Sequence, residues 1–388
     1  MNPLVKSWMI NKAHILLYIT LVFIFLPLRM FGIDLKNNLV LVFLAISVIL
    51  SIALKRFILD KDLFILSVFF TTLFSFSFIL NINNQILLKD VLELFKPFFF
   101  SFSFLLGVSL YKYYGLKFIE VFIYIMVFNF FFSFTVFFSE LNFLSDLFKG
   151  RMSDDPATFQ FKRFSGFFGY PSMYGIYSLL SIYLLKLIDV RHKSILYVLL
   201  SLGLLFSGSK AAIVVATFFI LATNLYLFFV LLIPIIIFLL LNIGINNDVL
   251  HETYIALKNI DFTTGNFGSA GHRVNELYLL YDSLGKNFFF GNGPSNYWLL
   301  NNHGPVESLL FFYAYKFGFF GLLYYLSILF FSVYMLLTNN KFRGFWLWVV
   351  IFLLAGIFSE SIIDEYKVII LTPLLMGFFY GASLKSKG

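Results

Sequence analysis

The sequence predicts an all-α fold, a polytopic bundle of about twelve transmembrane helices that forms one integral membrane domain over residues 1–388. Composition is the first reason, since 60% of the residues are apolar, only 12% are charged and the mean hydropathy is +0.90. A water-soluble core does not absorb that much apolar side chain. The second reason is that apolar runs of roughly 20 residues, the length that crosses hydrocarbon, recur along the whole chain. Helices satisfy their backbone hydrogen bonds internally, as a bilayer requires.

The predicted spans are apolar runs that end at charged or turn-forming residues, with ends defined to about two to four residues. They cover residues 13–32, 37–54, 63–80, 91–111, 117–138, 167–188, 194–207, 209–224, 226–244, 306–337, 344–361 and 367–384. The seventh and eighth are short, so either a full crossing or a partly re-entrant course is open for them. Gly203 and Gly208 between them predict a break or a close helix contact.

The distribution of lysine and arginine predicts the orientation. Basic residues gather in the loops on the N-terminal side: Lys6, Lys12, Lys55, Arg56, Lys61, Lys112, Lys117, Lys186, Arg191, Lys193, Lys341, Arg343, Lys385 and Lys387. The short loops opposite hold few, Lys36 and Lys89 among them. By the positive-inside rule both termini are cytoplasmic and the number of spans is even. The net charge of +8 therefore needs no nucleic-acid partner.

Two longer polar segments, residues 139–166 and 245–305, are expected on the outer face. The second contains an amphipathic stretch at 272–284 that predicts a helical subdomain. The sequence has no cysteine, which excludes a thiolate metal site and a cysteine nucleophile. Few charges are expected inside the spans, with Glu120 as one candidate, and the ionisable residues are expected at the outer rim.

Three cations stand near the predicted outer rim. Arg163 precedes a helix start rich in Gly and Pro, where free backbone N–H groups favour an anion, but an arginine that extends to lipid headgroups fits equally. Lys210 lies among small residues that favour an ammonium pointing into the bundle over an ordinary rim charge. His272 and Arg273 begin the outer helical stretch, and for His272 a solvated position is the simpler interpretation.

His303 and Glu307 lie just before a span, four residues apart, so that in a helix they share one face. A histidine near an interface is usually a structural hydrogen-bonding residue, but a carboxylate at this spacing favours a base or a substrate contact. Asp154 either begins a turn or contacts a substrate. The Asp60-Lys61-Asp62 stretch has the spacing of a nucleotide-sugar metal motif, yet helix capping explains it better in a short cytoplasmic loop. No metal site is predicted.

Five segments, called here the landmark segments, carry a resemblance to a known family. They are R-F-S-G-F-F-G-Y-P-S (163–172), S-G-S-K-A-A (207–212), F-F-G-N-G-P (289–294), N-H-G-P-V-E-S-L-L (302–310) and K-F-G-F-F-G-L (316–322). In this order they resemble the O-antigen polymerase and O-antigen ligase superfamily. The family pattern has an Arg-x-x-Gly stretch with Pro-Asn, a Ser-Arg, and an outer loop ending in His-Asn before a Gly-x-x-Gly span.

The chain departs from the family pattern at three places. Ser172 follows Pro171 where the family often has Asn, Lys210 replaces the Arg of Ser-Arg, and Gly304 follows His303 in place of Asn. The positive charge that would bind phosphate is kept, since Lys210 replaces an arginine, while the detailed geometry differs at all three places. The polymerases also have an arginine followed by a glycine in both outer loops. Here Arg163 precedes Gly175 and Arg273 precedes Gly285 at equal spacing.

The resemblance implies a GT-C-like, metal-independent, inverting glycosyltransferase without a cofactor on the periplasmic face of the bacterial inner membrane. Donor and acceptor would be glycans on undecaprenyl diphosphate, in contact with membrane lipids, and a chain-length regulator would be a partner. Arg163, Lys210 and Arg273 would bind the diphosphate, whereas His303 with Glu307 would activate the acceptor hydroxyl. His272, Tyr170 and Asp154 are further candidate substrate contacts.

Three other functions stay open at this stage. An O-antigen ligase would transfer finished polymer to a lipid A core sugar with the same cations and base. A lipid-linked oligosaccharide flippase would have about twelve spans too, but with charges along a central cavity. A structural scaffold would tolerate loss of all the candidate side chains.

Overall fold

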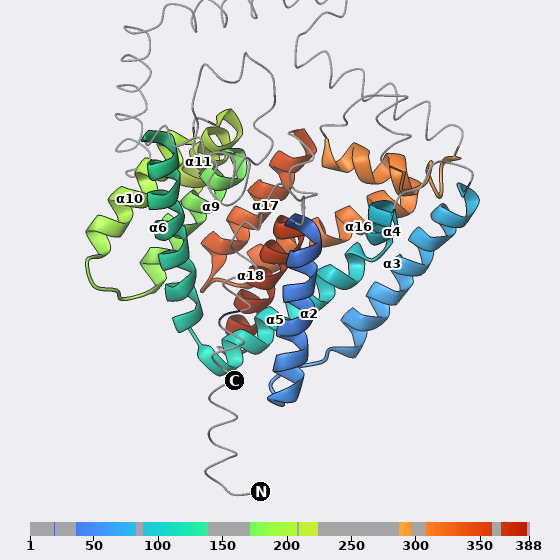
Figure 1. The fold of residues 1–388 in the computed structure, drawn as a ribbon, viewed down its shortest axis with the longest axis horizontal. Helices are drawn as coiled ribbons and strands as arrows, with labels where there is room; N and C mark the ends of the chain where they lie inside the picture. Colours follow the sequence, from blue (N-terminus) through green and yellow to red (C-terminus); the bar gives the residue numbers. More distant parts are fainter. Residues whose placement is uncertain are drawn as a thin grey trace, which may run out of the picture.

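The computed structural model describes residues 19, 36–82, 88–138, 171–207, 209–223, 287–295, 308–358 and 366–385, which are helical or in turns and contain no strand. The helices, shown in Figure 1, are α2 (Lys36–Ala53), α3 (Lys61–Leu80), α4 (Leu88–Leu94), α5 (Lys96–Tyr114), α6 (Lys117–Phe138), α9 (Pro171–Leu184), the 3-10 turn η2 (Leu185–Leu187), α10 (Lys193–Phe206), α11 (Lys210–Thr223), α16 (Leu309–Thr338), α17 (Arg343–Phe358) and α18 (Tyr366–Lys385). The predicted all-α class is therefore confirmed for this part of the chain.

Three of these helices are long and apolar enough to cross a membrane: Lys61–Leu80, Lys117–Thr135 and Leu309–Thr338. Shorter apolar helices accompany them, among them α10 with 14 residues, which packs against α6. These features identify a membrane protein. The predicted spans 13–32 and 226–244 and the outer segment 139–166 lie outside the described residues, as does most of segment 245–305.

The start of α3 confirms a capping role for Asp60. Its carboxylate Oδ1 accepts hydrogen bonds from the backbone N–H groups of Asp62 and Leu63, both at 3.0 Å. These are two of the donors that a helix start leaves without a partner. The Asp60-Lys61-Asp62 spacing thus serves helix initiation.

The predicted span 91–111 is two helices in the structure. α4 ends at Leu94, and α5 begins at Lys96 with Pro97 in its first turn, where a missing N–H costs nothing. Burial differs along α5, since residues 103–110 are buried whereas Lys112 and Tyr113 in the last turn are exposed. The break places two charged residues, Glu93 and Lys96, on either side of a bend in the chain.

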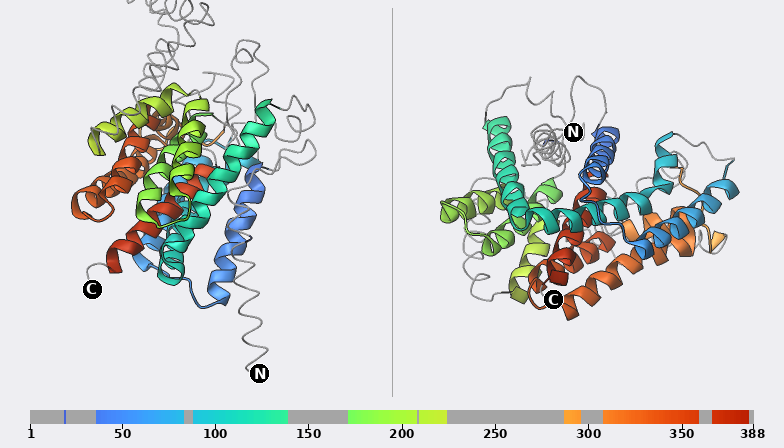
Figure 2. Two further views of the ribbon diagram at one scale, coloured as in Figure 1. Left: turned by 90° about the vertical axis from the view of Figure 1, so that its left-hand side faces the viewer. Right: turned by 90° about the horizontal axis from the view of Figure 1, so that it is seen from below.

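α5 and α18 cross in close contact at glycines, as Figures 1 and 2 show. A Cβ atom on Gly107 would collide with the backbone carbonyl of Leu374, and one on Gly377 would collide with that of Phe104. Small residues allow backbones to approach in this way, which is how helices associate in lipid without a hydrophobic driving force.

The predicted span 306–337 is a helical hairpin, because α16 is interrupted at Gly318 (φ 60°, ψ −143°). A Cβ atom on Gly321 would collide with the carbonyl oxygen of Tyr313. In a straight helix residues eight apart are separated by about 12 Å along the axis. The part before Gly318 therefore folds back on the part after it, and only the second part, about 20 residues long, has the length of a span.

Two of the described connections that carry basic residues lie at the same side of the bundle. The α2–α3 and α5–α6 connections lie at the lower side of Figure 1, next to the end of α18. Lys55 and Arg56 lie in the first of these, and Lys112 and Lys117 flank the second. This arrangement agrees with the orientation expected from the positive-inside rule.

Candidate functional site

Most of the site residues predicted from sequence lie outside the described part of the chain. These are Arg163, Arg273, His303, Glu307, His272, Tyr170 and Asp154. Their predicted roles remain predictions. Lys210 is the exception, since its backbone forms the first residue of α11.

The turn before Lys210 is built by two buried serines. The backbone N–H of Ala212 donates to the Ser209 hydroxyl at 3.2 Å, so Ser209 caps the start of α11. The Ser207 hydroxyl donates to the carbonyl oxygen of Leu204 at 2.6 Å and thereby closes the end of α10. The S-G-S-K segment is thus a compact connection between two helices, and it fixes where the backbone of Lys210 lies.

The first turns of α9 lie directly against this connection. A Cβ atom on Gly175 would lie 2.5 Å from the Ser207 hydroxyl oxygen and 2.6 Å from the Ala212 Cβ atom. On its other side α9 meets α10, where a Cβ atom on Gly203 would lie 2.6 Å from the Tyr174 hydroxyl oxygen. The close helix contact predicted at Gly203 is therefore confirmed. The landmark segment 207–212 therefore lies against α9, whose first two residues, Pro171 and Ser172, are the last two of the landmark segment 163–172.

A second pair of landmark segments is joined by hydrogen bonds. The backbone N–H of Asn292 donates to the carbonyl oxygen of Tyr315 at 2.9 Å, and that of Gly293 donates to the carbonyl oxygen of Lys316 at 3.0 Å. These carbonyl groups lost their helical partners at the break in α16. Buried backbone groups need partners, and the turn at 287–295 supplies them.

The bonding across the break is reciprocal. After Gly318, the backbone N–H of Phe319 donates to the carbonyl oxygen of Phe288 at 2.7 Å. A Cβ atom on Gly318 would lie 2.5 Å from that same oxygen. The turn at 287–295, within the predicted outer segment 245–305, is consequently fixed to the corner of the hairpin, and only glycine fits that corner.

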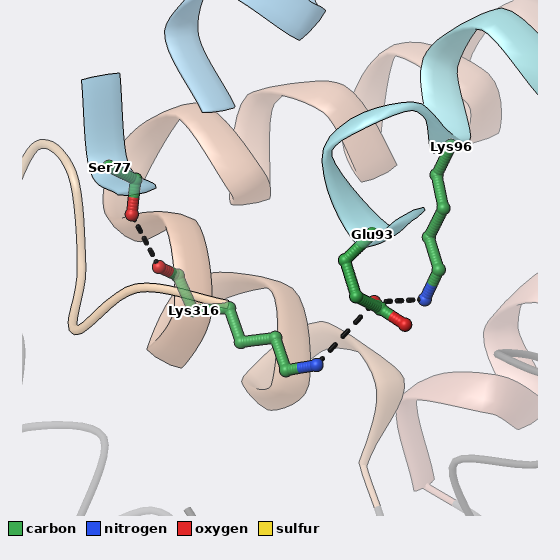
Figure 3. Close-up of polar contacts among 4 residues, drawn as sticks. All are labelled: Ser77, Glu93, Lys96 and Lys316. Atoms are coloured by element: carbon green, nitrogen blue, oxygen red, sulfur yellow. Dashed lines mark hydrogen bonds and ion pairs between the residues drawn. The ribbon is translucent and has the colours of Figure 1, made fainter. Parts of the chain in front are cut away.

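The C-terminal end of α3 joins this junction through two polar side chains. The Ser77 hydroxyl donates to the carbonyl oxygen of Lys316 at 2.9 Å (Figure 3). The Asn81 side-chain amide donates to the carbonyl oxygen of Gly291 at 3.3 Å. The break in α16 is thus held by a separate helix as well as by the turn.

A buried charge cluster, Glu93, Lys96 and Lys316, lies beside this junction (Figure 3). The Glu93 Oε2 atom forms ion pairs with both ammonium groups, at 3.4 Å from the Lys316 Nζ atom and closer still to that of Lys96. Both lysines are 0% exposed and Glu93 is 4% exposed. The three side chains come from α4, α5 and the first part of α16.

An aromatic ring covers the two ammonium groups of this cluster. The Lys316 Nζ atom lies 3.9 Å from the ring centroid of Phe312, and the Lys96 Nζ atom lies 5.3 Å from the same centroid. Cation–π attraction of this kind is stronger where water is excluded. The ring therefore replaces part of the solvation that the ammonium groups lose on burial.

The charge cluster was not predicted from the sequence. Glu93, Lys96 and Lys316 lie within the predicted spans 91–111 and 306–337, and all three are buried in the structure. Glu120 is only partly buried, in the first turn of α6. A signal was present, because charges within apolar runs mark functional positions by default.

The two groups of landmark segments are linked by α17, which packs against α9, α11 and α16. Within the described ranges no group of three or more His, Cys, Asp or Glu residues has the arrangement of a metal site. The charge cluster is built for anions, since its two ammonium groups already bind a carboxylate. No protein-family model and no curated protein sequence matches this chain.

Proposed function

We propose that this protein is an inverting glycosyltransferase that polymerises undecaprenyl-diphosphate-linked oligosaccharide repeat units into O-antigen or a related surface polysaccharide. In this proposal about twelve spans form a GT-C-like bundle in the bacterial inner membrane. Both termini are cytoplasmic and the active site faces the periplasm. The chain belongs, on this proposal, to the superfamily that its landmark segments resemble.

One observation supports the proposal: the landmark segments 289–294 and 316–322 are joined by backbone hydrogen bonds, and the landmark segment 207–212 packs against α9, which begins where the segment 163–172 ends. Gly175 contacts the S-G-S-K connection, and the turn at 287–295 is bonded to the segment around Lys316 and Gly318. If the resemblance were due to chance, the segments would not be expected to lie side by side. If they form one substrate site, this proximity is expected.

The proposed reaction is a single displacement at the anomeric carbon of the donor sugar. The acceptor hydroxyl oxygen forms the new C–O bond while the C–O bond to the lipid diphosphate breaks. His303, oriented by Glu307, takes the hydroxyl proton, and the leaving diphosphate carries away the bonding electron pair. Arg163, Lys210 and Arg273 stabilise its developing negative charge. Tyr170, Asp154 and His272 contact the sugars.

The test is reconstitution of the purified protein with defined lipid-linked repeat units, with product length measured on gels. Lys210→Met is expected to lower the polymerisation rate about 100-fold or more, because one charge-stabilising donor is lost. Lys210→Arg is expected to keep most of the activity, since the family pattern has arginine there. Lys341→Met is the matched control, because Lys341 is an exposed lysine after α16.

Other outcomes of the same reconstitution would contradict the proposal. Transfer of preformed polymer to a lipid A core acceptor, without lengthening of lipid-linked glycan, would identify a ligase. Movement of lipid-linked sugar across vesicles without lengthening would identify a flippase. Unchanged activity in the Lys210→Met and His303→Gln variants at equal protein level would remove the proposed residues from the reaction.

A further inference from the structure

The buried charge cluster is the feature that the proposed reaction leaves unexplained. Glu93, Lys96 and Lys316 come from three separate helical segments and meet at one carboxylate oxygen. The charges acting on Glu93 are those of Lys316 and Lys96. A chain that is 60% apolar had many ways to fill this space without charge.

Stability does not account for such a cluster. Removing three charged groups from water costs more than their attraction reliably returns, and apolar residues of similar volume often serve as well or better. Buried ionisable residues in membrane proteins instead mark pathways and sites for charged substrates. The cluster is therefore read as a binding site whose charges are needed for a ligand.

The backbone around the cluster supports this interpretation independently. Lys316 lies two residues before the break at Gly318, in a piece of helix that folds back on its own continuation. Interrupted helices at membrane depth are tolerated where they are enclosed by protein or line a site, and transporters bind their substrates at such breaks. Phe312, on the same piece, covers both ammonium groups.

We infer that Lys96 and Lys316 bind the phosphate of a polyprenyl-phosphate lipid, and that the Glu93 carboxylate holds the two ammonium groups together until the phosphate replaces it. A phosphate offers the same kind of oxygen atoms as the carboxylate, with more negative charge. The inference rests on the proposed function, because a polymerase binds two substrates that are each linked to a polyprenyl carrier. Arg163, Lys210 and Arg273 are assigned to the donor, so this site takes the acceptor.

The test measures binding of undecaprenyl phosphate, which carries no sugar, to the purified full-length protein in detergent. Lys96→Gln and Lys316→Gln are each expected to weaken binding about tenfold or more, because a charged hydrogen-bond donor is lost. Lys112→Gln should leave binding unchanged. Lys112 is the matched control, since it is an exposed lysine at the other end of α5.

Glu93→Gln separates a binding site from a structural ion pair. Without its carboxylate the two ammonium groups repel each other, so the melting temperature falls. Undecaprenyl phosphate is expected to restore about 3 °C or more of that loss, more than it adds to the wild-type protein, since the lipid phosphate takes the place of the carboxylate. Weaker binding in Glu93→Gln, equal to the loss in the lysine variants, would overturn the inference.

The Phe312→Leu variant tests the same site if the charge variants do not fold. It keeps all three charges but uncovers the ammonium groups, so the affinity for undecaprenyl phosphate should rise about threefold or more. An unchanged affinity would contradict the site. Inorganic pyrophosphate is the comparison ligand, and stabilisation by pyrophosphate alone would overturn the assignment to a lipid.

The outcomes keep this inference apart from the proposed function. If the protein binds undecaprenyl phosphate through Lys96 and Lys316 but never lengthens glycan, the phosphate site is supported and the polymerase proposal is contradicted. If both lysine variants polymerise glycan at the wild-type rate, with the wild-type dependence on substrate concentration, the conclusion is the opposite. The proposed reaction is then supported and the phosphate site is contradicted.

Discussion

Ser77 contributes one hydroxyl group to a junction of three segments, and its energetic role is testable. Ser77→Ala removes the hydrogen bond to the carbonyl oxygen of Lys316 inside a fully buried contact. The free energy of unfolding should fall by about 0.5–1.5 kcal/mol, measured by thermal or denaturant unfolding in detergent. Ser75→Ala is the control, because the Ser75 hydroxyl bonds only to Thr71 within its own helix. Equal losses in the two variants would contradict a special role for Ser77.

At the scale of single residues, the sequence offers only part of the charge cluster. Lys96 follows Glu93 by three residues, a spacing at which side chains of opposite charge can pair, yet nothing local links Lys316 to the same carboxylate. That pairing depends on the fold-back of α16, which brings Lys316 beside α4. Asp60 was predictable as a cap because its partners are its immediate neighbours.

The hairpin of α16 provides a prediction at the scale of elements. Gly318 (φ 60°, ψ −143°) and Gly115 (φ 56°, ψ −147°) have nearly the same backbone conformation. A Cβ atom on Gly115 meets nothing within 4 Å, whereas one on Gly318 lies 2.5 Å from the Phe288 carbonyl oxygen. Gly115→Ala therefore reports backbone strain alone, on the order of 1–3 kcal/mol.

Gly318→Ala adds a collision with the turn at 287–295 to the same strain. It should lower stability more than Gly115→Ala does, and the yield of folded protein in detergent should drop accordingly. The comparison is made by size-exclusion profile and melting temperature of the two variants. Equal destabilisation would show that the turn moves aside and does not fix the corner.

The hairpin also shows why it was easier to predict where helices lie in the sequence than where a helix reverses direction. Hydropathy stays high on both sides of Gly318, so the sequence from 306 to 337 looks like one span. A helix that is apolar all round has little periodicity from which a reversal would show. For a straight helix such as α6, the length of the apolar run alone was enough to predict where the helix lies.

At the scale of the whole molecule, the absence of cysteine makes the orientation testable. Ile82 follows α3 and is 61% exposed, and Asn340 is exposed between α16 and α17. In cells with a permeabilised outer membrane, a membrane-impermeant maleimide should label Ile82→Cys and leave Asn340→Cys unlabelled. Labelling of Asn340→Cys only would invert the proposed topology.

The helical class and membrane character of the molecule followed from composition, whereas its assembly did not. Gly107 and Gly377 are unremarkable in the sequence, but each receives a backbone carbonyl of the other helix in the α5–α18 crossing. Such contacts between distant helices depend on shape complementarity, which one sequence does not reveal.

The bonds from α3 to the broken helix have a consequence for biosynthesis. Asn81 and Ser77 bond to residues 210 and 239 positions further along the chain. Since a ribosome delivers the chain from its N-terminus, α3 is made long before the residues to which these two side chains bond. Premature termination before residue 291 would thus leave Ser77 and Asn81 without these long-range partners.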